Sequence, residues 1–403
     1  MKKVATAVPV SAARARSVRS RILAAGSGVV LTGALVAGPA HAASATPTDA
    51  GILEGTPALS EDAASSAAES SESSEGAHAT RGAPDSRSVL ASYWSADRRA
   101  DARPRTPGVP EWNDSAGPKS GEPASSTAPA AGGGNGGPGG PGNGKGKGDG
   151  AVATDPLETK SEPVGPTVVD ADDPEPSAEL SPVAGKVSFT DPADGLDYTC
   201  SGSAVNSESK SLVVTAAHCV HGGPAGGFYE NWVFMPAYGA GMSPEGVFAA
   251  ESMFTFADWA EHGAVGAGFD SDVAFVRTSP NEEGTEVVDE VGGHGLTVGG
   301  AHMTEATLYA YPGNIENGEL QQECTGAVDE YALEGYTFNR ITGCDFGGGS
   351  SGGSWLEDYS VDEGLGTVRT VTSFGPANNN RYIAGAYFGT RAGALYDAAD
   401  AAL

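Results

Sequence analysis

The chain has 403 residues, with 23 Lys and Arg against 52 Asp and Glu, which gives a formal net charge of −29. Proteins that bind nucleic acid or an anionic membrane surface need clustered Lys and Arg, so this charge argues against both kinds of partner. The 59 Gly and 26 Pro residues are typical of a chain of which only part packs into a core.

The first residues follow the pattern of an export signal. Basic residues within 2–21 precede an apolar stretch, 22–36, and Ala40-His41-Ala42 supplies small residues at a cleavage point. A stretch of about fifteen apolar residues is too short to span a bilayer comfortably. We therefore expect residues 1–42 to be a cleaved signal peptide. The mature protein would be secreted and extracellular, without a membrane anchor, and able to form disulfides.

Residues 43–184 have the composition of a pro-region or low-complexity linker. Residues 43–82 are rich in Ala, Ser and Glu and hold hardly a large apolar side chain, so we expect no core there. Residues 132–150 form a Gly-rich flexible spacer, and residues 155–182 are acidic, Pro-rich and expected to be extended. A largely disordered N-terminal region is therefore expected before the folded domain.

One segment of this region differs from its surroundings. Residues 88–104 read SVLASYWSADRRADARP, in which Ser95 can cap a short helix that follows a group of apolar and aromatic side chains. A Tyr-Trp pair in a disordered region is often only adhesive, but such a pair can also dock on a surface.

Residues 185–403 have the composition of a globular domain. Short β-rich runs such as SLVVTAA, NWVFMP, DVAFVR and ATLYAY alternate with Gly, Asn, Asp and Pro, which predicts an all-β antiparallel sandwich or barrel. Residues 392–403 (AGALYDAADAAL) are the one convincing helical segment. All four Cys residues lie in this part, and from residue 184 onward 7 basic residues against 30 acidic ones leave a net charge of −23.

A histidine and an aspartate lie beside two of the predicted strands. His218 ends the run SLVVTAAHC, where small neighbours leave its imidazole room, although a histidine in such a place is often only a satisfied core residue. Asp272 leads directly into the apolar run VAFV, where a buried carboxylate without a partner costs several kcal/mol. An imidazole N–H of His218 would remove that cost, so we favour Asp272 over Asp270 as the partner.

Glycines surround a serine in the run GGGSSGGSW, residues 347–355. This run can be a flexible loop, but a loop that carries a nucleophile needs glycines on both sides, to turn sharply and to keep bulk away from the attacked carbonyl. Ser351 is the position that such a loop would present. The backbone N–H groups of Gly349 and Ser351 would then form an oxyanion hole.

The segments TAAHC, DVAFV and GGSSGGSW, in the order His, Asp, Ser, resemble the trypsin/chymotrypsin-like serine endopeptidases. More narrowly, they resemble the secreted bacterial branch that includes the glutamyl endopeptidases. The resemblance covers about residues 185–403. It implies two packed six-stranded antiparallel β-barrels with a C-terminal helix. It also implies a triad of His218, Asp272 and Ser351 that hydrolyses peptide bonds through an acyl-enzyme, with no cofactor and no metal.

The cysteines extend the resemblance. Cys200 and Cys219 resemble the family's hairpin disulfide beside the catalytic histidine. Four cysteines allow three pairings, and a pair of Cys324 with Cys344 would close a second loop of about 20 residues. Free thiols or a metal site are disfavoured because the cysteines lack the spacing of metal ligands.

The substrate-binding residues follow from the same resemblance. Ser373-Phe374-Gly375 resembles the strand whose backbone pairs with the substrate, and Gly385 resembles the back of the specificity pocket. Asp345, six residues before Ser351, stands where a carboxylate at the pocket floor would select Arg or Lys, although it can equally be a structural residue. Thr372 stands where glutamyl endopeptidases have a His, which lowers the case for Glu specificity.

Ser350 bears on activation. Trypsin-like enzymes that are activated by a new N-terminus carry an Asp at this position, and its ion pair with the new amine orders the oxyanion hole. A serine cannot form that pair, so we expect a zymogen that is activated when a covering pro-segment is removed. Residues 92–104 (SYWSADRRADARP) resemble the pro-segment of secreted actinobacterial members.

Two other functions stay open at this stage. An esterase would also form an acyl-enzyme, but the strand–elbow–helix context and the Ser, Asp, His order of such enzymes are absent from the sequence. A catalytically silent extracellular binding module on the same fold is the alternative from another class. We expect a monomer that acts on protein or peptide substrates. Four histidines show no ligand pattern and are expected at the surface: His221, His262, His294 and His302.

Overall fold

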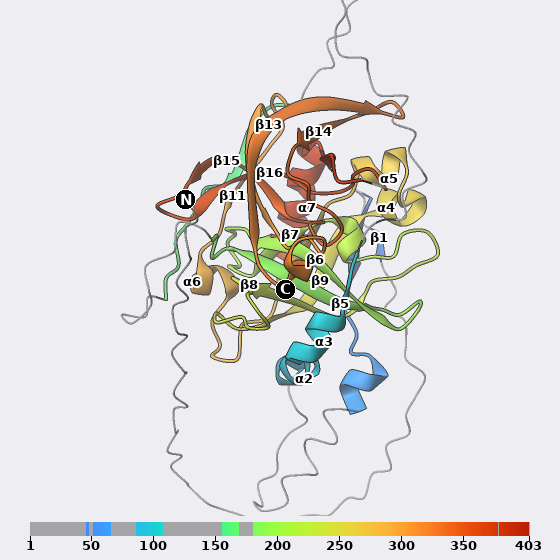
Figure 1. Cartoon of the computed structure of the whole chain (residues 1–403), viewed down its shortest axis with the longest axis vertical. Coiled ribbons are helices and arrows are strands. Elements are labelled where there is room, and N and C mark those ends of the chain that lie inside the picture. Colours follow the sequence, from blue (N-terminus) through green and yellow to red (C-terminus); the bar gives the residue numbers. More distant parts are fainter. Residues whose placement is uncertain are drawn as a thin grey trace, which may run out of the picture. The chain divides into compact units, whose positions relative to one another are not determined.

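The computed structural model describes residues 46–47, 51–65, 86–105, 107, 155–168, 180–377 and 379–402. The expected signal peptide (1–42) and the Gly-rich spacer (132–150) lie outside the described residues. The described part is mostly β, with a closed six-stranded antiparallel barrel, a second sheet and a C-terminal helix (Figure 1). No helix within these residues is long and apolar enough to cross a membrane.

The first barrel pairs its strands in the order β9-β10-β7-β6-β5-β8, and β8 pairs with β9 to close it. Its strands are β5 (Ala184–Asp191), β6 (Leu196–Ala204), β7 (Leu212–Thr215), β8 (Glu230–Pro236), β9 (Phe248–Phe256) and β10 (Ala274–Thr278). β7 and most of β10 are buried on both faces, as their unbroken apolar and β-branched composition predicts. These two strands are the predicted runs SLVV and AFVR, and the ends of both lead to the site.

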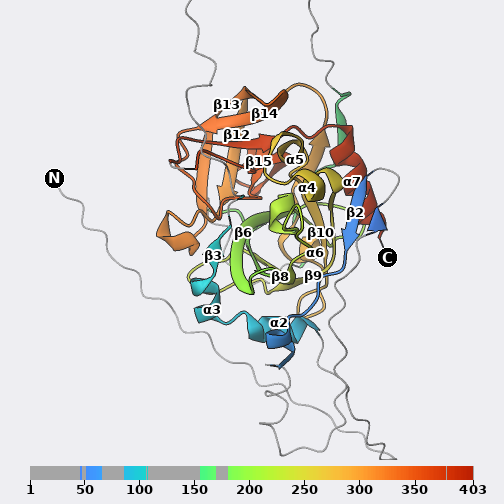
Figure 2. The same cartoon turned by 90° about the vertical axis from the view of Figure 1, so that its right-hand side faces the viewer.

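The second sheet contains the six antiparallel strands expected for a second barrel, in the order β17-β14-β13-β12-β15-β16. They are β12 (Glu305–Ala310), β13 (Gln322–Leu333), β14 (Tyr336–Thr342), β15 (Ser354–Ser360), β16 (Leu365–Val371) and β17 (Tyr382–Ala386). An antiparallel bridge between Phe374 and Ala384 joins the chain after β16 to β17, so the two ends of the run meet. Figure 2 separates this sheet, in orange and red, from the green and yellow strands of the first barrel.

Helices are short except at the C-terminus. Helix α7 (Thr390–Ala401) packs against β9, β10 and β11 (Gly295–Val298) and confirms the predicted terminal helix, which begins two residues earlier than its sequence pattern indicates. Its Tyr396 meets Phe275 of β10 edge to face, with ring centroids 5.6 Å apart. The other helices of the domain are η2 (Ala217–Cys219), α4 (Ala257–His262), α5 (Gly266–Asp270), α6 (Val287–Val291) and η3 (Glu316–Gly318).

Four short strands of the N-terminal region pair with the two sheets. β1 (Thr46–Pro47) and β2 (Ile52–Gly55) extend the first sheet beyond β9, β3 (Arg103–Pro104) runs parallel to β6, and β4 (Glu158–Ser161) pairs with β11. The expectation that residues 43–82 hold no buried core is wrong for Ile52, Leu53 and Ala63, which are buried. An edge strand also gains hydrogen bonds from the backbone of its neighbour, so few apolar side chains are needed to hold it.

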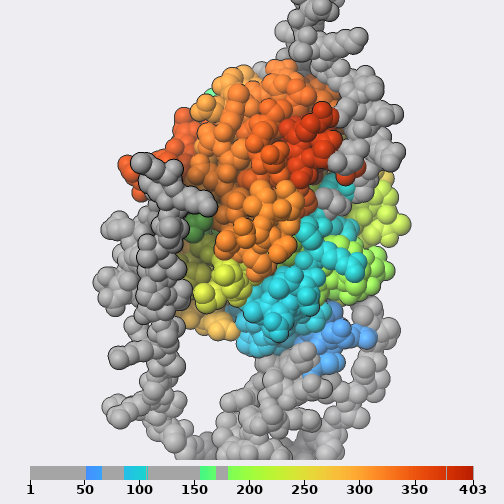
Figure 3. All heavy atoms as spheres, in the orientation of Figure 1, coloured from blue at the N-terminus to red at the C-terminus, as the bar shows by residue number. Residues whose placement is uncertain are grey.

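Helices α2 (Ser86–Tyr93) and α3 (Ala96–Asp101) dock the Tyr-Trp segment on the first barrel. The Trp94 indole N–H donates to the backbone carbonyl of Asn231 at 2.7 Å. Ser95 caps α3 by accepting from the Arg98 N–H at 3.3 Å, as predicted. Apolar side chains of this segment share one cluster with residues of β8, β9 and nearby loops: Val89, Leu90, Tyr93, Trp94, Val233, Met235, Tyr238, Ala249 and Tyr311. Figure 3 shows residues 86–105 as a cyan band on the molecular surface.

Two of the histidines expected at the surface are buried. The His221 ring packs edge to face against Phe228, and burial lowers the pKa of His221 to about 4. His294 is fully buried, and burial lowers its pKa to about 3. The expectation was wrong for both, because a single neutral imidazole in a core leaves no periodic pattern in the sequence. His262 is exposed, as expected.

Candidate active site

His218 and Asp272 come together at one edge of the first barrel. β7 and β10 are antiparallel with Thr215 opposite Ala274, so the chain leaving β7 meets the chain entering β10. The Asp272 carboxylate approaches His218 twice, with Oδ2 2.8 Å from the imidazole Nδ1 and Oδ1 accepting from the backbone N–H at 2.9 Å. The Ser373 hydroxyl donates to Oδ2 at 2.5 Å. Three hydrogen bonds therefore stabilise this fully buried carboxylate.

The carboxylate fixes the orientation and tautomer of the imidazole. An acceptor at Nδ1 holds a proton there, which leaves Nε2 of His218 as the basic nitrogen. This Nε2 is buried and has no hydrogen-bond partner among the described residues. Asp270, the rival candidate, is half-buried away from this pair, and burial raises its pKa. The pair that forms is the one that the sequence favoured.

The loop that presents Ser351 requires glycine at two points. Gly349 has a φ of +91°, and a Cβ there would lie 2.7 Å from the Tyr311 carbonyl oxygen. Gly352 has a φ of +80°, and a Cβ there would lie 2.1 Å from the Thr215 hydroxyl oxygen. Both positions combine a left-handed backbone with close packing, so a larger residue at either would displace Ser351.

Hydrogen bonds pin the same loop to β6. The Ser201 N–H donates to the Ser351 carbonyl at 2.7 Å, and the Ser201 hydroxyl donates to the Gly349 carbonyl at 2.8 Å. The Ser350 hydroxyl donates to the Gly347 carbonyl at 2.7 Å and closes the turn within the loop. The loop is therefore ordered by its own contacts and by β6.

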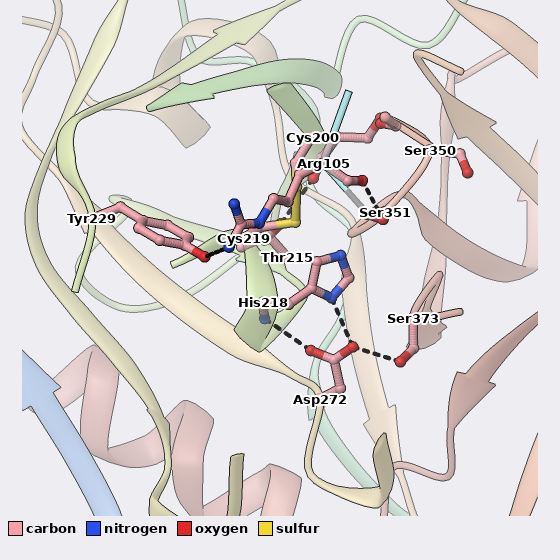
Figure 4. Close-up of a disulfide and its surroundings, with 12 residues drawn as sticks. Arg105, Cys200, Thr215, His218, Cys219, Tyr229, Asp272, Ser350, Ser351 and Ser373 are labelled. Carbon is pink, nitrogen blue, oxygen red and sulfur yellow. Dashed lines mark hydrogen bonds and ion pairs between the residues drawn. A yellow bond between two sulfur atoms is a disulfide. The ribbon is translucent and has the colours of Figure 1, made fainter. Parts of the chain in front are cut away.

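The N-terminal region reaches Ser351 through the Arg105 carbonyl oxygen. This oxygen accepts from the Ser351 hydroxyl at 3.3 Å (Figure 4). It also accepts from the Gly349 N–H at 3.3 Å. The Arg105 N–H donates to the Thr199 carbonyl at 2.8 Å, just before Cys200. The Arg105 carbonyl is thus in contact with both the expected oxyanion hole and the expected nucleophile.

A cavity of about 330 Å³ lies beside Ser351. The expected substrate-binding residues Ser373-Phe374-Gly375 line it, together with Thr372, Tyr382 and Pro107. The described side chains that line it are all uncharged. The cavity therefore offers polar hydroxyl and amide groups and aromatic faces, but no carboxylate.

Two expected pocket residues lie elsewhere. Asp345 is exposed with a φ of +55°, and its backbone carbonyl accepts from the Asn314 side-chain amide at 2.8 Å. Gly385 lies within β17, where a Cβ would stand 2.3 Å from the Val371 carbonyl oxygen. Neither is among the residues that line the cavity, and Ile383, on the same strand as Gly385, takes that place.

Both expected disulfides form, Cys200 with Cys219 and Cys324 with Cys344. The first ties β6 to η2 beside His218. Cys200, Cys219 and His218 are the described residues whose potential metal-ligating atoms lie close together. Because both sulfurs are disulfide-bonded, this group offers no thiolate to a metal ion.

Sequence reasoning missed the residues that complete the site from a distance. Ser373 was assigned only to substrate pairing, but it also bonds Asp272. Arg105 and Pro107 lie more than 240 residues before Ser351 in a region judged largely disordered, and only the neighbouring SYWSADRRADARP motif pointed to a docking segment.

Comparisons with known proteins agree with this geometry. No protein-family model and no curated protein sequence matches the chain. A thermostable serine protease, AL20, from an extremophilic microorganism matches with a TM-score of 0.50 and 33% identity, over 55% of this chain and 99% of that one. Protease Anisep from Arthrobacter nicotinovorans matches with a TM-score of 0.50 and 30% identity, over 56% of this chain and 98% of that one. The chain belongs to the bacterial serine proteases of chymotrypsin-like fold.

Proposed function

We propose that the chain is a secreted serine endopeptidase, made as a precursor, that hydrolyses peptide bonds through an acyl-enzyme on Ser351. The observation that carries the proposal is the convergence of two groups on one carbonyl oxygen. The Ser351 hydroxyl and the Gly349 N–H both donate to it, beside the His218–Asp272 pair. It would act as a monomer on protein or peptide substrates, without a cofactor.

The proposed chemistry begins with proton transfer to His218. Its neutral Nε2 takes the proton of Ser351 as the hydroxyl oxygen attacks the peptide carbonyl carbon. Asp272 accepts from Nδ1 and stabilises the imidazolium that forms. The imidazolium then gives its proton to the leaving amine, and water repeats the sequence on the ester.

The developing oxyanion would be held by backbone N–H groups of the glycine loop. The Gly349 N–H already donates to the Arg105 carbonyl oxygen, which stands in for the carbonyl of a substrate. The Ser351 N–H is the proposed second donor. Donors that are fixed by glycine geometry need no reorganisation when the charge appears, which is how such loops lower the barrier.

Residues 86–107 are proposed as the covering pro-segment. This segment pairs with Thr199 through the Arg105 N–H, contacts Ser351 through the Arg105 carbonyl and reaches the cavity at Pro107. Its strand β3 runs parallel to β6. A substrate whose acyl part occupies the cavity would run the other way, out of the cavity and past Thr199. The reversed direction supports a segment that blocks the site without being its substrate.

The proposed preference before the scissile bond is for an uncharged side chain. The cavity is lined by groups such as Thr372, Phe374 and Tyr382, and the exposed position of Asp345 gives it no role at the floor. Cleavage of a peptide library by the processed enzyme tests this. Cleavage mainly after Arg, Lys or Glu would contradict it.

One experiment separates the candidate functions. The secreted, processed protein is treated with a fluorophosphonate probe and then offered casein. Labelling of Ser351 with degradation of casein is expected. Absence of labelling favours a silent binding module, and labelling without proteolysis favours an esterase.

A further inference from the structure

The Arg105 side chain occupies a cation site beside Ser351 that the proposed chemistry does not use. Its guanidinium Nη2 donates to the Tyr229 hydroxyl at 2.7 Å (Figure 4). The same nitrogen lies 3.1 Å from Oδ2 of Asp191. The guanidinium carbon also stands 4.6 Å from the ring centroid of Tyr198 and 5.2 Å from that of Tyr229. A carboxylate and two aromatic faces around one guanidinium are the groups that select Arg or Lys.

The side chains that surround the Arg105 guanidinium belong to the first barrel. Tyr229 is fully buried and stacks on Phe189 with centroids 4.4 Å apart. Asp191 is 7% exposed, and its Oδ1 accepts from the Ala193 N–H at 3.0 Å, which orients Oδ2 toward Arg105. Their positions are set by β5, its turn and the start of β8. The site would therefore persist after residues 86–107 have left.

The cation site lies on the leaving-group side of Ser351. The leaving amine must meet Nε2 of His218, and Cys219, which follows His218, is bonded to Cys200. Thr199, next to Cys200, pairs with the backbone of Arg105. The chain that follows a scissile bond would pass this same edge, so its first side chains fall within reach of Asp191.

Charge on the surrounding hairpin favours the same ligand. The hairpin of β5 and β6 carries Asp191 at the end of β5, Asp194 in the turn and Asp197 at the start of β6. Arg98 pairs with Asp197 at 2.6 Å, as Arg105 pairs with Asp191. Removal of the pro-segment would take away both cations and leave an acidic edge, which attracts basic substrates.

We propose that Asp191, Tyr198 and Tyr229 form a subsite for an Arg or Lys side chain at the first or second residue after the scissile bond. The inference rests on the proposed endopeptidase function and adds a second determinant of specificity. In the precursor the same subsite holds Arg105, so the pro-segment and the substrate compete for it.

The test compares quenched fluorescent peptides that differ at one position. The full chain is expressed, and the secreted, self-processed enzyme is given peptides with Arg or its neutral isostere citrulline at the first or second residue after the bond. We expect Arg to raise kcat/KM about tenfold over citrulline at one of the two positions. Asp191→Asn keeps the Oδ1 acceptor for Ala193 and should reduce this ratio to about twofold or less.

Two further variants bracket the result. Asp197→Asn removes the same charge from the same hairpin and keeps the Oδ1 acceptor for the Thr190 hydroxyl, and its partners in the structure are not subsite residues, so it should keep the full Arg preference. Tyr229→Phe keeps the ring but loses the hydroxyl, and should reduce the preference by a smaller factor than Asp191→Asn.

The proposal fails if the processed enzyme cleaves the Arg and citrulline peptides equally at both positions. It also fails if Asp197→Asn lowers the preference as much as Asp191→Asn, because the effect would then be general electrostatic attraction. Failure of the endopeptidase function would look different, since every peptide would stay intact and Ser351 would not be labelled, and it would overturn the subsite as well.

Discussion

The two barrels divide the work of the site unequally. The first supplies His218 and Asp272 and also carries most of the docked N-terminal segment. The second supplies Ser351, the Gly349 N–H and the cavity, and meets that segment mainly through the Arg105 carbonyl and Pro107. The proposed chemistry therefore needs both barrels, whereas the proposed inhibition is anchored mainly on one.

This difference suggests that the covering of the site by residues 86–107 can be tested separately from catalysis. Trp94 is fully buried against the first barrel, and Arg98 pairs with Asp197 on the hairpin of the same barrel. None of these residues touches Ser351 or His218 through a hydrogen bond or ion pair given by the structure. We call Trp94 and Arg98 the anchor of the proposed pro-segment. Substitutions in this anchor should change access to Ser351 and leave the chemistry of the site intact.

The largest expected effect tests whether the barrels act as a unit. Ser351→Ala or His218→Ala should lower kcat/KM by roughly 10⁴–10⁶, and the double variant should be about as inactive as either single one. Proton transfer from a serine needs the base, so losing either group removes the same step. The measurement is peptide hydrolysis by protein processed in trans with immobilised wild-type enzyme, which is then removed.

The outcome distinguishes two arrangements. If the loss of kcat/KM in the double variant equals the product of the two single losses, the two residues act independently. The hypothesis that they share one proton-transfer step would then be wrong. Activity that survives either single substitution would contradict the assignment of Ser351 as the nucleophile and His218 as the base.

The next largest effect concerns the anchor. Trp94→Ala in the full-length precursor should raise the rate of fluorophosphonate labelling at Ser351 about 10²-fold. Removing a fully buried Trp costs about 3–5 kcal/mol of packing, and each 1.4 kcal/mol changes the open fraction tenfold. Labelling is followed in the unprocessed band on a gel, so that only the precursor is measured.

Leu59→Ala is the matched control for the anchor. Leu59 also belongs to the N-terminal region but is 37% exposed, so its truncation should leave the labelling rate unchanged. Equal rates for the wild type and Trp94→Ala would show that residues 86–107 do not limit access to the serine.

Local signals explain which parts of the molecule the sequence predicts. His218, Asp272 and Ser351 each lie at a strand end or in a glycine loop, where a few neighbouring residues define the environment, and the structure brings His218 and Asp272 into contact. The β-runs and the terminal helix are predicted for the same reason. Both disulfides also follow the expected pairing.

Features that depend on distant packing are not predictable in this way. The spacing of Asp345 from Ser351 left open both a place at the pocket floor and a structural role, and the structure has it exposed, with a left-handed backbone. Arg105 depends on where a remote segment docks. The neighbours of His294 in the sequence give no sign that it is buried. Strands that are distant in the sequence come together around it.

The smallest expected effect tests the junction at His294. Its backbone pairs with the first barrel through Ala204 and Asn206, while its Nδ1 accepts from the Gly366 N–H of β16 at 3.3 Å. Burial lowers its pKa to about 3, against about 6.5 in an unfolded chain. Between these values the unfolded state binds more protons, so stability falls as the pH drops below about 6.5.

Urea unfolding at pH 7.5 and 5.5 measures this loss in a Ser351→Ala background, which prevents autolysis. The buried imidazole should contribute about 1 kcal/mol of destabilisation over that interval. His294→Gln should reduce the pH dependence by that amount, whereas His262→Gln, at an exposed position, should leave it unchanged. His221, whose pKa burial also lowers, keeps part of the slope in both variants. If His294→Gln shows the full wild-type slope, the junction between the barrels is not a proton-sensitive element.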